Sequence, residues 1–323
     1  MEHTEQQQIA NAANIIRGGG VVAFPTETVY GLGANAFDEK AVARVFEIKR
    51  RPYFDPLILH IDSMDWLDGL AARIPEPAKT LLGRLWPGPL TVVLPKKPAV
   101  PDIATSGLPG AAIRMPSNDI ARRLIAAAGV PIAAPSANLF GCVSPTTAAH
   151  VRDGLGGSVD ALIDGGECAV GIESTIISFM NDTPLMLRPG GTPLEEIEAV
   201  IGKVIIPASG ELANQSPGRS AAHYATSTPL ARVRDAAELA NLTGKVGLLV
   251  FGDIDAGSLP PNVAKTEFLS KNGDLREAAC NLFAAMRRLD AAGADIIAAL
   301  PVPNAGLGLA INDRLSRAAT RKS

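Results

Sequence analysis

The chain has 323 residues, of which 47% are hydrophobic and 20% charged, and its formal net charge is -3. This length suggests two domains, and this composition is typical of a globular protein with a large core. The weakly acidic charge excludes a global basic field that would recruit nucleic acid, and an aromatic content of 4% leaves few rings to stack on bases.

We expect neither a secretory segment nor a membrane segment. Residues 1–8 are polar, and no apolar run approaches the roughly 18 residues of a membrane-spanning helix. The three cysteines, Cys142, Cys168 and Cys280, are far apart and form no paired ligand motif. These features favour a reduced, cytoplasmic protein that has no metal site of its own and does not contact a membrane.

The first predicted elements bring a hydroxyl-rich loop to the end of a strand. Residues 5–17 can form a helix, which the glycines at 18–20 end, and residues 21–24 are a predicted strand. The loop that follows, residues 25–33, reads Pro-Thr-Glu-Thr-Val-Tyr-Gly-Leu-Gly. Its hydroxyl groups and carboxylate could hold a polar substrate or satisfy a tight turn, and the pattern leaves both open.

The second predicted helix ends in a cluster of cations. Asp38 caps this helix, apolar residues recur at helical spacing, and the segment Lys49-Arg50-Arg51-Pro52 ends it. Cations at a helix C-terminus complement the helix dipole, and proline ends helices. Alternatively, two of these cations bind phosphate, arginine by a two-pronged contact and lysine as a point charge.

Two of the next strands carry a titratable or charged residue. Strands are predicted over 57–61, 90–94 and 111–115, and helices over 75–85 and 117–128. His60 lies at the end of the first of these strands, a place more typical of a structural histidine than of a ligand. Arg114 lies inside an apolar run. Because an unpaired buried charge is very costly, Arg114 needs an anionic partner, either a protein carboxylate or a ligand.

The segment from residue 130 to residue 150 is the one around which the chain is organised. It begins as a predicted strand over 130–134 and continues as a polar loop with Ser136 and Asn138. Ser144 and Pro145 then begin a predicted helix. Free backbone amides and a helix N-terminus at a strand end favour an anion, although an ordinary strand-to-helix turn explains the pattern equally well.

The remaining elements divide the chain in two. Further strands are predicted over 161–164, 175–179, 185–187 and 203–206, with a helix over 193–201. A stretch rich in Ser, Gly and Pro follows and contains His223 and Tyr224. Beyond it, strands over 230–233, 246–251 and 296–300 alternate with helices over 275–292 and 311–321. We therefore predict a large α/β domain at 1–207, a linker at 208–229 and a smaller α/β domain at 230–323.

Several standard catalytic motifs are absent from the sequence. There is no phosphate loop ending in Gly-Lys-Ser or Gly-Lys-Thr, no two-histidine zinc motif and no Gly-x-Ser-x-Gly nucleophile turn. The residues by themselves indicate an anion-binding α/β protein and do not identify a reaction.

Many short segments, in this order and at this spacing, resemble a known family. They are residues 24–33, Lys49-x-Arg51-Pro52 with Pro56-Leu57 and His60, and residues 86–91, 113–116, 135–138, 144–147, 171–175 and 187–190. In these segments the chain resembles the YrdC-like family, the L-threonylcarbamoyladenylate synthases. The linker and the segment 308–314 resemble the long form of that family, which has an additional C-terminal domain, so the resemblance covers nearly the whole chain.

The resemblance implies a fold and a reaction. The fold is a YrdC-like twisted mixed sheet with helices, in a catalytic domain at 1–207, followed by a smaller Rossmann-like α/β domain. The reaction is a nucleotidyl transfer in which ATP, L-threonine and bicarbonate give threonylcarbamoyl-AMP and pyrophosphate. The product would pass to a separate tRNA threonylcarbamoyl-transferase complex that modifies the adenosine beside the anticodon, and we expect direct binding of tRNA to be weak or absent.

The resemblance also implies roles for individual residues. L-threonine would be held by Thr28, His60, Arg114, Ser136 and Ser174, with Arg114 on its carboxylate. ATP would be held by Lys49, Arg51, Asp55, Asn138, Ser144, Arg188 and Tyr224. Of these, Lys49 and Arg51 would be catalytic, and Tyr224 would close over the site. Mg²⁺ would be carried by the phosphates of ATP rather than by a dedicated protein cage.

Four positions depart from the family pattern. Asp55 stands where Asn is usual, and its carboxylate would repel a triphosphate unless a metal or Arg51 lies between them. Phe140, Cys142 and Thr226 also differ from the residues that are common in the family. These departures concern the details of nucleotide contact more than the assignment to the family.

Two other functions stay open at this point. A non-catalytic RNA- or nucleotide-binding member of the same fold would use the basic cluster at residues 49–51 and would bind tRNA in a steeply salt-dependent manner. A carbamoyl-transfer enzyme would use the same adenylate chemistry on carbamoyl phosphate and would ignore threonine.

Overall fold

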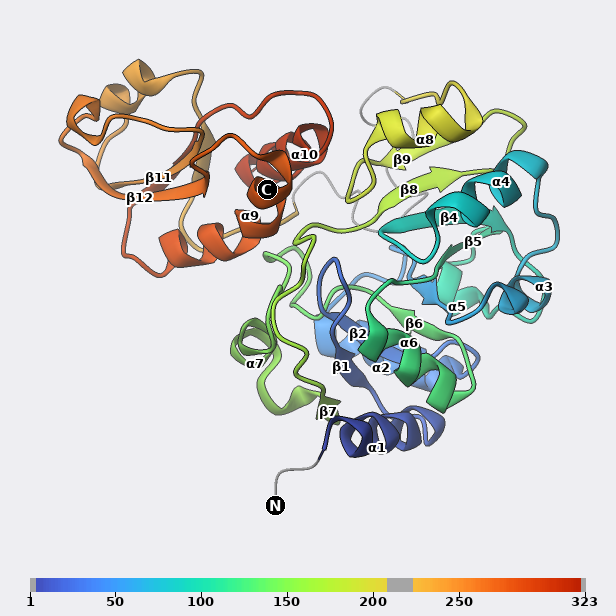
Figure 1. Cartoon of the computed structure of the whole chain (residues 1–323). Coiled ribbons are helices and arrows are strands. Elements are labelled where there is room, and N and C mark those ends of the chain that lie inside the picture. The colour runs from blue at the N-terminus through green and yellow to red at the C-terminus, as the bar shows by residue number, and fades with distance from the viewer. Residues whose placement is uncertain (1–3, 208–222, 321–323) are drawn as a thin grey trace.

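The computed structural model describes residues 4–207 and 223–320 and places them in two α/β units (Figure 1). The N-terminal unit is built on one nine-stranded mixed sheet with the strand order β7-β1-β2-β6-β3-β5-β4-β8-β9. Its strands are β1 (Val22–Phe24), β2 (Gly31–Asn35), β3 (Ile58–His60), β4 (Leu90–Pro95), β5 (Gly110–Arg114), β6 (Ile132–Ala134), β7 (Ala161–Leu162), β8 (Thr175–Ser178) and β9 (Leu185–Arg188). Its helices are α1 (Glu5–Arg17), α2 (Glu39–Lys49), α3 (Leu67–Leu70), α4 (Glu76–Leu85), α5 (Asp102–Thr105), α6 (Asp119–Ala128), α7 (Ala148–Leu155) and α8 (Leu194–Ile201).

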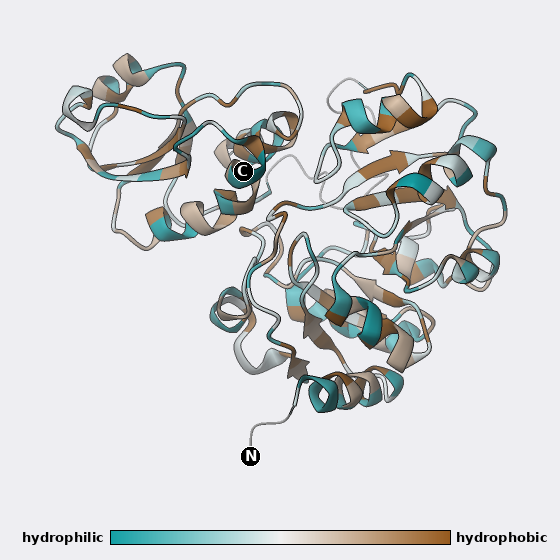
Figure 2. Cartoon of the chain, in the orientation of Figure 1, coloured by the Kyte–Doolittle hydropathy of each residue, from teal (hydrophilic) through white to brown (hydrophobic). Residues whose placement is uncertain are grey.

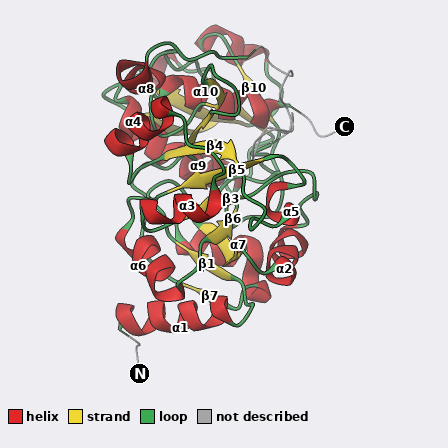
Figure 3. Cartoon of the chain, turned by 90° about the vertical axis from the view of Figure 1, so that its right-hand side faces the viewer, coloured by secondary structure: helices red, strands yellow, loops and turns green. Residues whose placement is uncertain are grey.

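Two apolar clusters form on this sheet because neighbouring residues of a strand point to opposite faces. Val22 and Phe24 of β1 pack in a cluster with residues of α1 and α6, whereas Ala23 between them packs in a cluster with residues of α2. Figure 2 shows the hydrophobic colour on many of the strands, while the helices carry both colours. In Figure 3 the strands occupy the centre of the molecule and the helices surround them.

The C-terminal unit contains a four-stranded parallel sheet with the order β10-β13-β11-β12. Its strands are β10 (Leu230–Arg232), β11 (Val246–Phe251), β12 (Val263–Ser270) and β13 (Ile296–Ala299), and its helices are α9 (Leu275–Asp290) and α10 (Gly308–Ala319). The two helices lie between this sheet and the N-terminal unit (Figure 1). Val29, Val143 and Ile172 of the N-terminal unit join the apolar cluster of α9 and α10. The two units therefore share a core.

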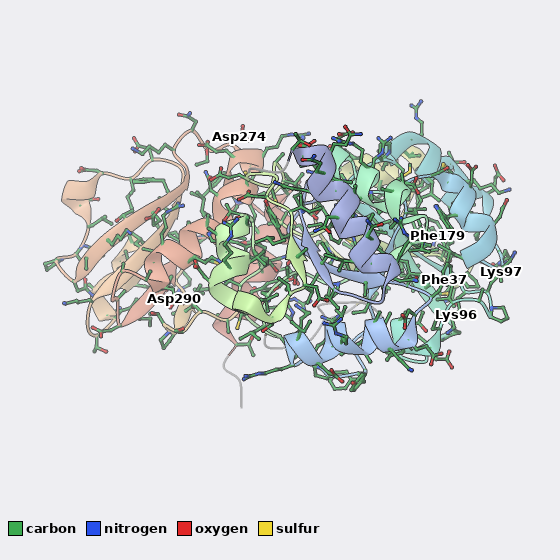
Figure 4. All side chains as sticks on the ribbon, turned by 90° about the horizontal axis from the view of Figure 1, so that it is seen from below. Phe37, Lys96, Lys97, Phe179, Asp274 and Asp290 are labelled. Carbon is green, nitrogen blue, oxygen red and sulfur yellow. The ribbon has the colours of Figure 1, made fainter. Side chains whose placement is uncertain are left out.

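Figure 4 labels Asp274 and Asp290 at the two ends of α9. Between these ends, the thiol of Cys280 donates to the carbonyl of Cys168 over 3.4 Å, so this helix lies directly on the N-terminal unit. The architecture confirms the predicted fold class, a large mixed sheet with helices followed by a smaller α/β domain. The predicted domain boundaries stay a prediction, and residues 208–222 of the predicted linker lie outside the described residues.

Two predictions near the central segment are wrong. The predicted loop 25–33 ends early, because residues 31–35 form β2 and the glycines there serve packing rather than a turn. A Cβ on Gly33 would meet the ring of Phe24 at 2.6 Å. The predicted helix does not begin at Ser144, since α7 begins at Ala148 and the hydroxyl of Thr147 accepts from the amide of His150 over 3.2 Å.

Three further differences concern the ends of the two units. The predicted strand over 203–206 is reduced to one isolated bridge between Leu185 and Ile205, whose side chain is exposed. The sequence analysis missed β12, because Lys265 and Glu267 interrupt the apolar pattern of this edge strand. The last helix begins at Gly308, one turn before its predicted start.

None of the helices formed by residues 4–207 and 223–320 is long and apolar enough to cross a bilayer.

Candidate active site

A cavity lies among the strand ends of the N-terminal unit, and His223 and Tyr224 form part of its lining. Eight of the predicted site residues line it: Thr28, Arg51, His60, Arg114, Ser136, Ser174, Arg188 and Tyr224. The other lining residues are Thr26, Val29, Gly31, Ile58, Ala134, Pro135, Glu173 and His223. The remaining four predicted site residues, Lys49, Asp55, Asn138 and Ser144, are buried but are not part of this lining.

Three side chains stand in one row across the sheet. His60 of β3 is paired with Arg114 of β5, and Arg114 is paired in turn with Thr91 of β4. Residues paired across neighbouring strands point to the same face of the sheet. The row therefore directs a histidine, an arginine and a threonine to the face on which the cavity lies, although they are far apart in the sequence.

Arg114 has a protein carboxylate as its partner. Its Nη2 lies 2.7 Å from Oε1 of Glu27, and its Nη1 donates to the hydroxyl of Thr28 over 2.8 Å. Burial tends to raise the pKa of Glu27, but the charge of Arg114 outweighs it and the pKa is lowered, so Glu27 is ionised. The sequence analysis left a protein carboxylate and a ligand open. The structure supplies the carboxylate, while Nε of Arg114 has no hydrogen-bond partner among the described residues.

His60 is buried and neutral. Its Nδ1 lies 3.2 Å from the carbonyl oxygen of Ile58, and a backbone hydrogen bond with Ile132 also acts on the ring. A neutral imidazole keeps one ring nitrogen as an acceptor. Burial lowers the pKa of His60 to about 3, and the nearby charge of Arg114 adds to this effect. The residue can accept a hydrogen bond from a ligand in the cavity.

Lys49 binds the backbone of the loop that follows β6. Its Nζ donates to the carbonyls of Ser136 and Asn138, and its own carbonyl accepts from the amide of Phe140 over 2.8 Å. Burial holds the pKa of Lys49 well below its ordinary value, and the charge of Arg51 adds to the shift. The side-chain nitrogen of Lys49 thus stabilises the loop at residues 136–138 and does not line the cavity.

Arg51 lines the cavity and neutralises Asp55. Its Nη2 lies 2.9 Å from Oδ2 of Asp55, and the guanidinium also donates to the carbonyls of Asp55 and Pro56, each over 2.9 Å. The charge of Arg51 therefore compensates the carboxylate of Asp55, which stands where the family usually has Asn. The ring of Phe140, a second departure from the family pattern, lies 5.9 Å from Cζ of Arg51 and packs edge-on against His223.

Glu173 joins the two units at the wall of the cavity. Its Oε1 accepts from the hydroxyl of Ser144 over 2.5 Å, and its Oε2 accepts from Nε and Nη2 of Arg314 in α10, each over 3.1 Å. Burial would raise the pKa of Glu173, but Arg314 and Arg188 outweigh burial and lower it to about 2. The hydroxyl of Ser144 is thus bound to Glu173, and α7 is capped by Thr147 instead.

Ser174 lies next to Glu173 and is tied to two other side chains. Its hydroxyl is 2.7 Å from the hydroxyl of Thr91 and accepts from Nη2 of Arg188 over 3.1 Å. Nε of Arg188 donates to the carbonyl of Ser174, also over 3.1 Å. Burial lowers the pKa of Arg188 to about 10, which leaves it charged near neutral pH.

Asn138 and Tyr224 make different kinds of contact. The side-chain amide of Asn138 donates to the carbonyls of Leu139 and Cys142 and so stabilises its own loop.

Tyr224 is fully buried, and its ring stacks on Phe283 of α9 and has its centroid 5.6 Å from Cζ of Arg314. Its hydroxyl has no hydrogen-bond partner among the described residues, and its φ of 66° is rare for a residue other than glycine.

The last two departures from the family pattern, Cys142 and Thr226, lie beside and on the segment that leads into the C-terminal unit. Cys142 forms a parallel bridge with Ala225, and the amide of Ala225 donates to the carbonyl of Gly141 over 2.7 Å. The hydroxyl of Thr226 donates to the carbonyl of Thr228 over 2.6 Å. These contacts fix the path of the chain after Tyr224.

Comparison with known proteins agrees with this geometry. A family model for Sua5, YciO and YrdC, described as telomere recombination, matches residues 14–190, and a model described as the C-terminal domain of threonylcarbamoyl-AMP synthase matches residues 192–320. The threonylcarbamoyl-AMP synthase of Pyrococcus abyssi is 46% identical, over 98% of this chain and 95% of that protein. The chain belongs to the threonylcarbamoyl-AMP synthase family.

Other members of the family agree over the full chain. The threonylcarbamoyl-AMP synthase of Bacillus subtilis is 43% identical, over 98% of this chain and 94% of that protein. A crystal structure of P. abyssi Sua5 complexed with L-threonine superposes with a TM-score of 0.89 at 45% identity, and covers 98% of this chain and 96% of that chain. These matches confirm the resemblance found in the sequence and the long, two-domain form.

Several residues of the site received no definite role from the sequence. Glu27, Thr91, Glu173 and Arg314 all lie in segments that carry the family resemblance, so the signal was present without a role attached to it. Phe283, on which Tyr224 stacks, gave no signal beyond helical apolar spacing.

Proposed function

We propose that this chain synthesises threonylcarbamoyl-AMP and pyrophosphate from ATP, L-threonine and bicarbonate. The observation that carries the proposal is the pairing of His60 with Arg114 across the sheet, with both side chains at the cavity of a chain whose full-length relatives are named threonylcarbamoyl-AMP synthase. The product would serve a separate tRNA threonylcarbamoyl-transferase complex. Such a role implies a cytoplasmic location.

We assign the amino-acid substrate to Thr28, His60, Arg114, Ser136 and Ser174. Arg114 carries a charge and a free Nε, so it can bind the carboxylate of L-threonine while Glu27 holds its other edge. The neutral ring of His60 can accept a hydrogen bond from the hydroxyl or amino group of the substrate. The P. abyssi relative, which was crystallised with L-threonine, supports L-threonine as the ligand.

We assign ATP to Arg51, Arg188 and Tyr224 at the cavity, and to Lys49, Asn138 and Ser144 behind it. Asp55 belongs to this set through its ion pair with Arg51. Lys49, Arg51 and Arg188 donate to backbone carbonyls. Phosphate oxygens carry full charge and make stronger hydrogen bonds than carbonyls, so the cations would exchange these partners for phosphate when ATP binds.

The chemistry requires positioning and charge neutralisation. Threonine first becomes a carbamate, and an oxygen of that carbamate attacks the α-phosphorus of ATP while pyrophosphate leaves. Lys49 and Arg51, the proposed catalytic residues, would neutralise the charge that develops on the departing phosphates.

The donor set fits a metal ion that arrives with the nucleotide. Asp55 and Glu173 are each paired with an arginine, and the described residues contain no cluster of three or more His, Cys, Asp or Glu that could hold a metal. We therefore propose that Mg²⁺ is held by the phosphates of ATP, where it would neutralise part of their charge.

Release of pyrophosphate tests the proposal. The purified full-length protein is incubated with ATP and Mg²⁺, and threonine and bicarbonate are each left out in turn. We expect release only when both are present. Release that ignores threonine but requires carbamoyl phosphate would indicate the carbamoyl-transfer enzyme. No release, combined with tRNA binding that weakens steeply with salt, would indicate the binding module.

A further inference from the structure

Thr91 is a buried polar residue to which neither the family resemblance nor the proposed reaction gives a task. It lies in β4, opposite Arg114 of β5, and is fully buried. Its hydroxyl oxygen is 2.7 Å from the hydroxyl oxygen of Ser174, which lines the cavity. Among the described residues this hydroxyl has no other hydrogen-bond partner.

The direction of this hydrogen bond follows from the available acceptors. A buried hydroxyl proton without an acceptor costs the full desolvation of the group. In the part of the chain that the structure describes, the hydroxyl oxygen of Ser174 is the one acceptor within reach of Thr91, so we infer that Thr91 donates to it. Ser174 also accepts from Nη2 of Arg188 over 3.1 Å. Both lone pairs of the Ser174 oxygen are then occupied.

The remaining proton of Ser174 then points away from both donors and toward the cavity. Ser174 is thereby a hydrogen-bond donor to the ligand, and its partner is an acceptor oxygen. Thr91 is paired with Arg114 on the neighbouring strand and hydrogen-bonded to Ser174. The two donors that line the cavity, Arg114 and Ser174, therefore lie on either side of Thr91. A carboxylate offers one oxygen to each of two such donors.

We propose that Thr91 is a positioning residue that fixes Ser174 as the hydrogen-bond donor to the carboxylate of L-threonine. The inference rests on the proposed function, because it takes L-threonine as the occupant of the cavity. It adds a residue outside the lining of the cavity and a definite hydrogen-bond direction for a residue inside it.

The test replaces Thr91 with valine, which has the same shape and no hydroxyl. The initial rate of pyrophosphate release is measured against L-threonine and, separately, against ATP. We expect Thr91→Val to raise KM for L-threonine about three- to tenfold, which is the cost of about one neutral hydrogen bond, and to change kcat and KM for ATP less than about twofold. Thr91→Ser keeps the hydroxyl and is expected to restore KM to nearly the wild-type value.

A double-variant cycle separates this role from a structural one. Ser174→Ala removes the donor itself, so Thr91→Val should have no further effect on KM for L-threonine in that background. An equal effect of Thr91→Val with and without Ser174 would overturn the proposal, as would an unchanged KM for L-threonine or an increase confined to KM for ATP. Pyrophosphate release by the wild-type protein without threonine would instead refute the proposed function.

Discussion

Arg314 of α10 and Glu173 of the N-terminal unit form an ion pair across the boundary between the two units, with 3.1 Å between Nη2 and Oε2. Arg314 is fully buried, and it also donates to the carbonyl of Pro189. Glu173 lines the cavity and accepts from the hydroxyl of Ser144. The C-terminal unit thus supplies a charge that holds a wall of the cavity in place.

Replacement of Arg314 by methionine should strongly destabilise the protein. The variant leaves the carboxylate of Glu173 buried without its cation, and such a loss typically costs about 3 to 5 kcal/mol. We expect the free energy of unfolding, measured by urea denaturation, to fall by this amount, and pyrophosphate release to fall with it because Ser144 loses its fixed acceptor.

Two comparisons isolate the buried pair. Arg234→Met removes an exposed arginine that pairs with Glu238 and should leave the unfolding midpoint unchanged. The double variant Arg314→Met with Glu173→Gln removes the uncompensated charge and should regain about half of the lost stability or more. If the double variant is as unstable as Arg314→Met alone, the ion pair is not the cause.

The contact between the units also depends on Gly171. Its φ is +75°, and a Cβ at this position would meet the Cα of Cys280 at 2.4 Å. We expect Gly171→Ala to lower the free energy of unfolding by about 2 to 4 kcal/mol, because it adds backbone strain and forces α9 away from the cavity. Thermal unfolding and the rate of pyrophosphate release measure the two effects.

Gly129 provides the matched control for this prediction. Its φ is +67°, and nothing lies within 4 Å of a Cβ built on it. Gly129→Ala therefore adds the strain without the clash, and we expect a smaller loss of about 1 to 2 kcal/mol with normal activity. Equal effects of the two variants would mean that close packing at Cys280 contributes nothing.

Stability should decrease as the pH falls below neutrality. Burial lowers the pKa of both His60 and His223 from 6.5 to about 3, so the folded protein stays unprotonated at these residues while the unfolded chain takes up protons. Between about pH 7.5 and about pH 5.5 each histidine should remove about 1.4 kcal/mol from the free energy of unfolding.

Urea denaturation at the two pH values measures this difference. The double variant His60→Asn with His223→Asn lacks both groups and should show a weaker pH dependence than the wild type, even if it is less stable at every pH. The part that remains is the share of His150, whose pKa burial lowers to about 4. A pH dependence as steep as that of the wild type would show that other groups cause it.

Replacing Arg51 should weaken the use of ATP, and replacing its ion-pair partner Asp55 should strengthen ATP binding. Arg51→Ala removes a charge-assisted phosphate contact of about 1.5 to 3 kcal/mol, so we expect kcat/KM for ATP to fall roughly tenfold to hundredfold. Asp55→Asn removes a negative charge 2.9 Å from Arg51, and we expect KM for ATP to decrease about two- to fivefold. Kinetics of pyrophosphate release measure both changes. Unchanged kinetics in Arg51→Ala would exclude Arg51 from the site. A higher KM for ATP in Asp55→Asn would mean that the carboxylate of Asp55 helps to orient Arg51.

Much of the site could be predicted from the sequence, because its residue types and spacings carry the family resemblance. Eight of the twelve predicted residues line one cavity. The other four are buried behind it for reasons that no local pattern contains. Lys49 is an example: the sequence gives its charge, but only the fold shows that two carbonyls of the loop at residues 136–138 surround its ammonium group.

The sequence by itself determined the alternation of strands and helices, the two-unit organisation and the family, because periodicity, turn residues and short motifs are local properties. Tertiary structure alone decided which polar groups meet. Glu173 and Arg314 are 141 residues apart, and Arg114 meets both His60 and Thr91 only through the strand order β3-β5-β4. Such pairings depend on strand register and on how two units pack, and both are set by the burial of the whole apolar surface rather than by any short segment.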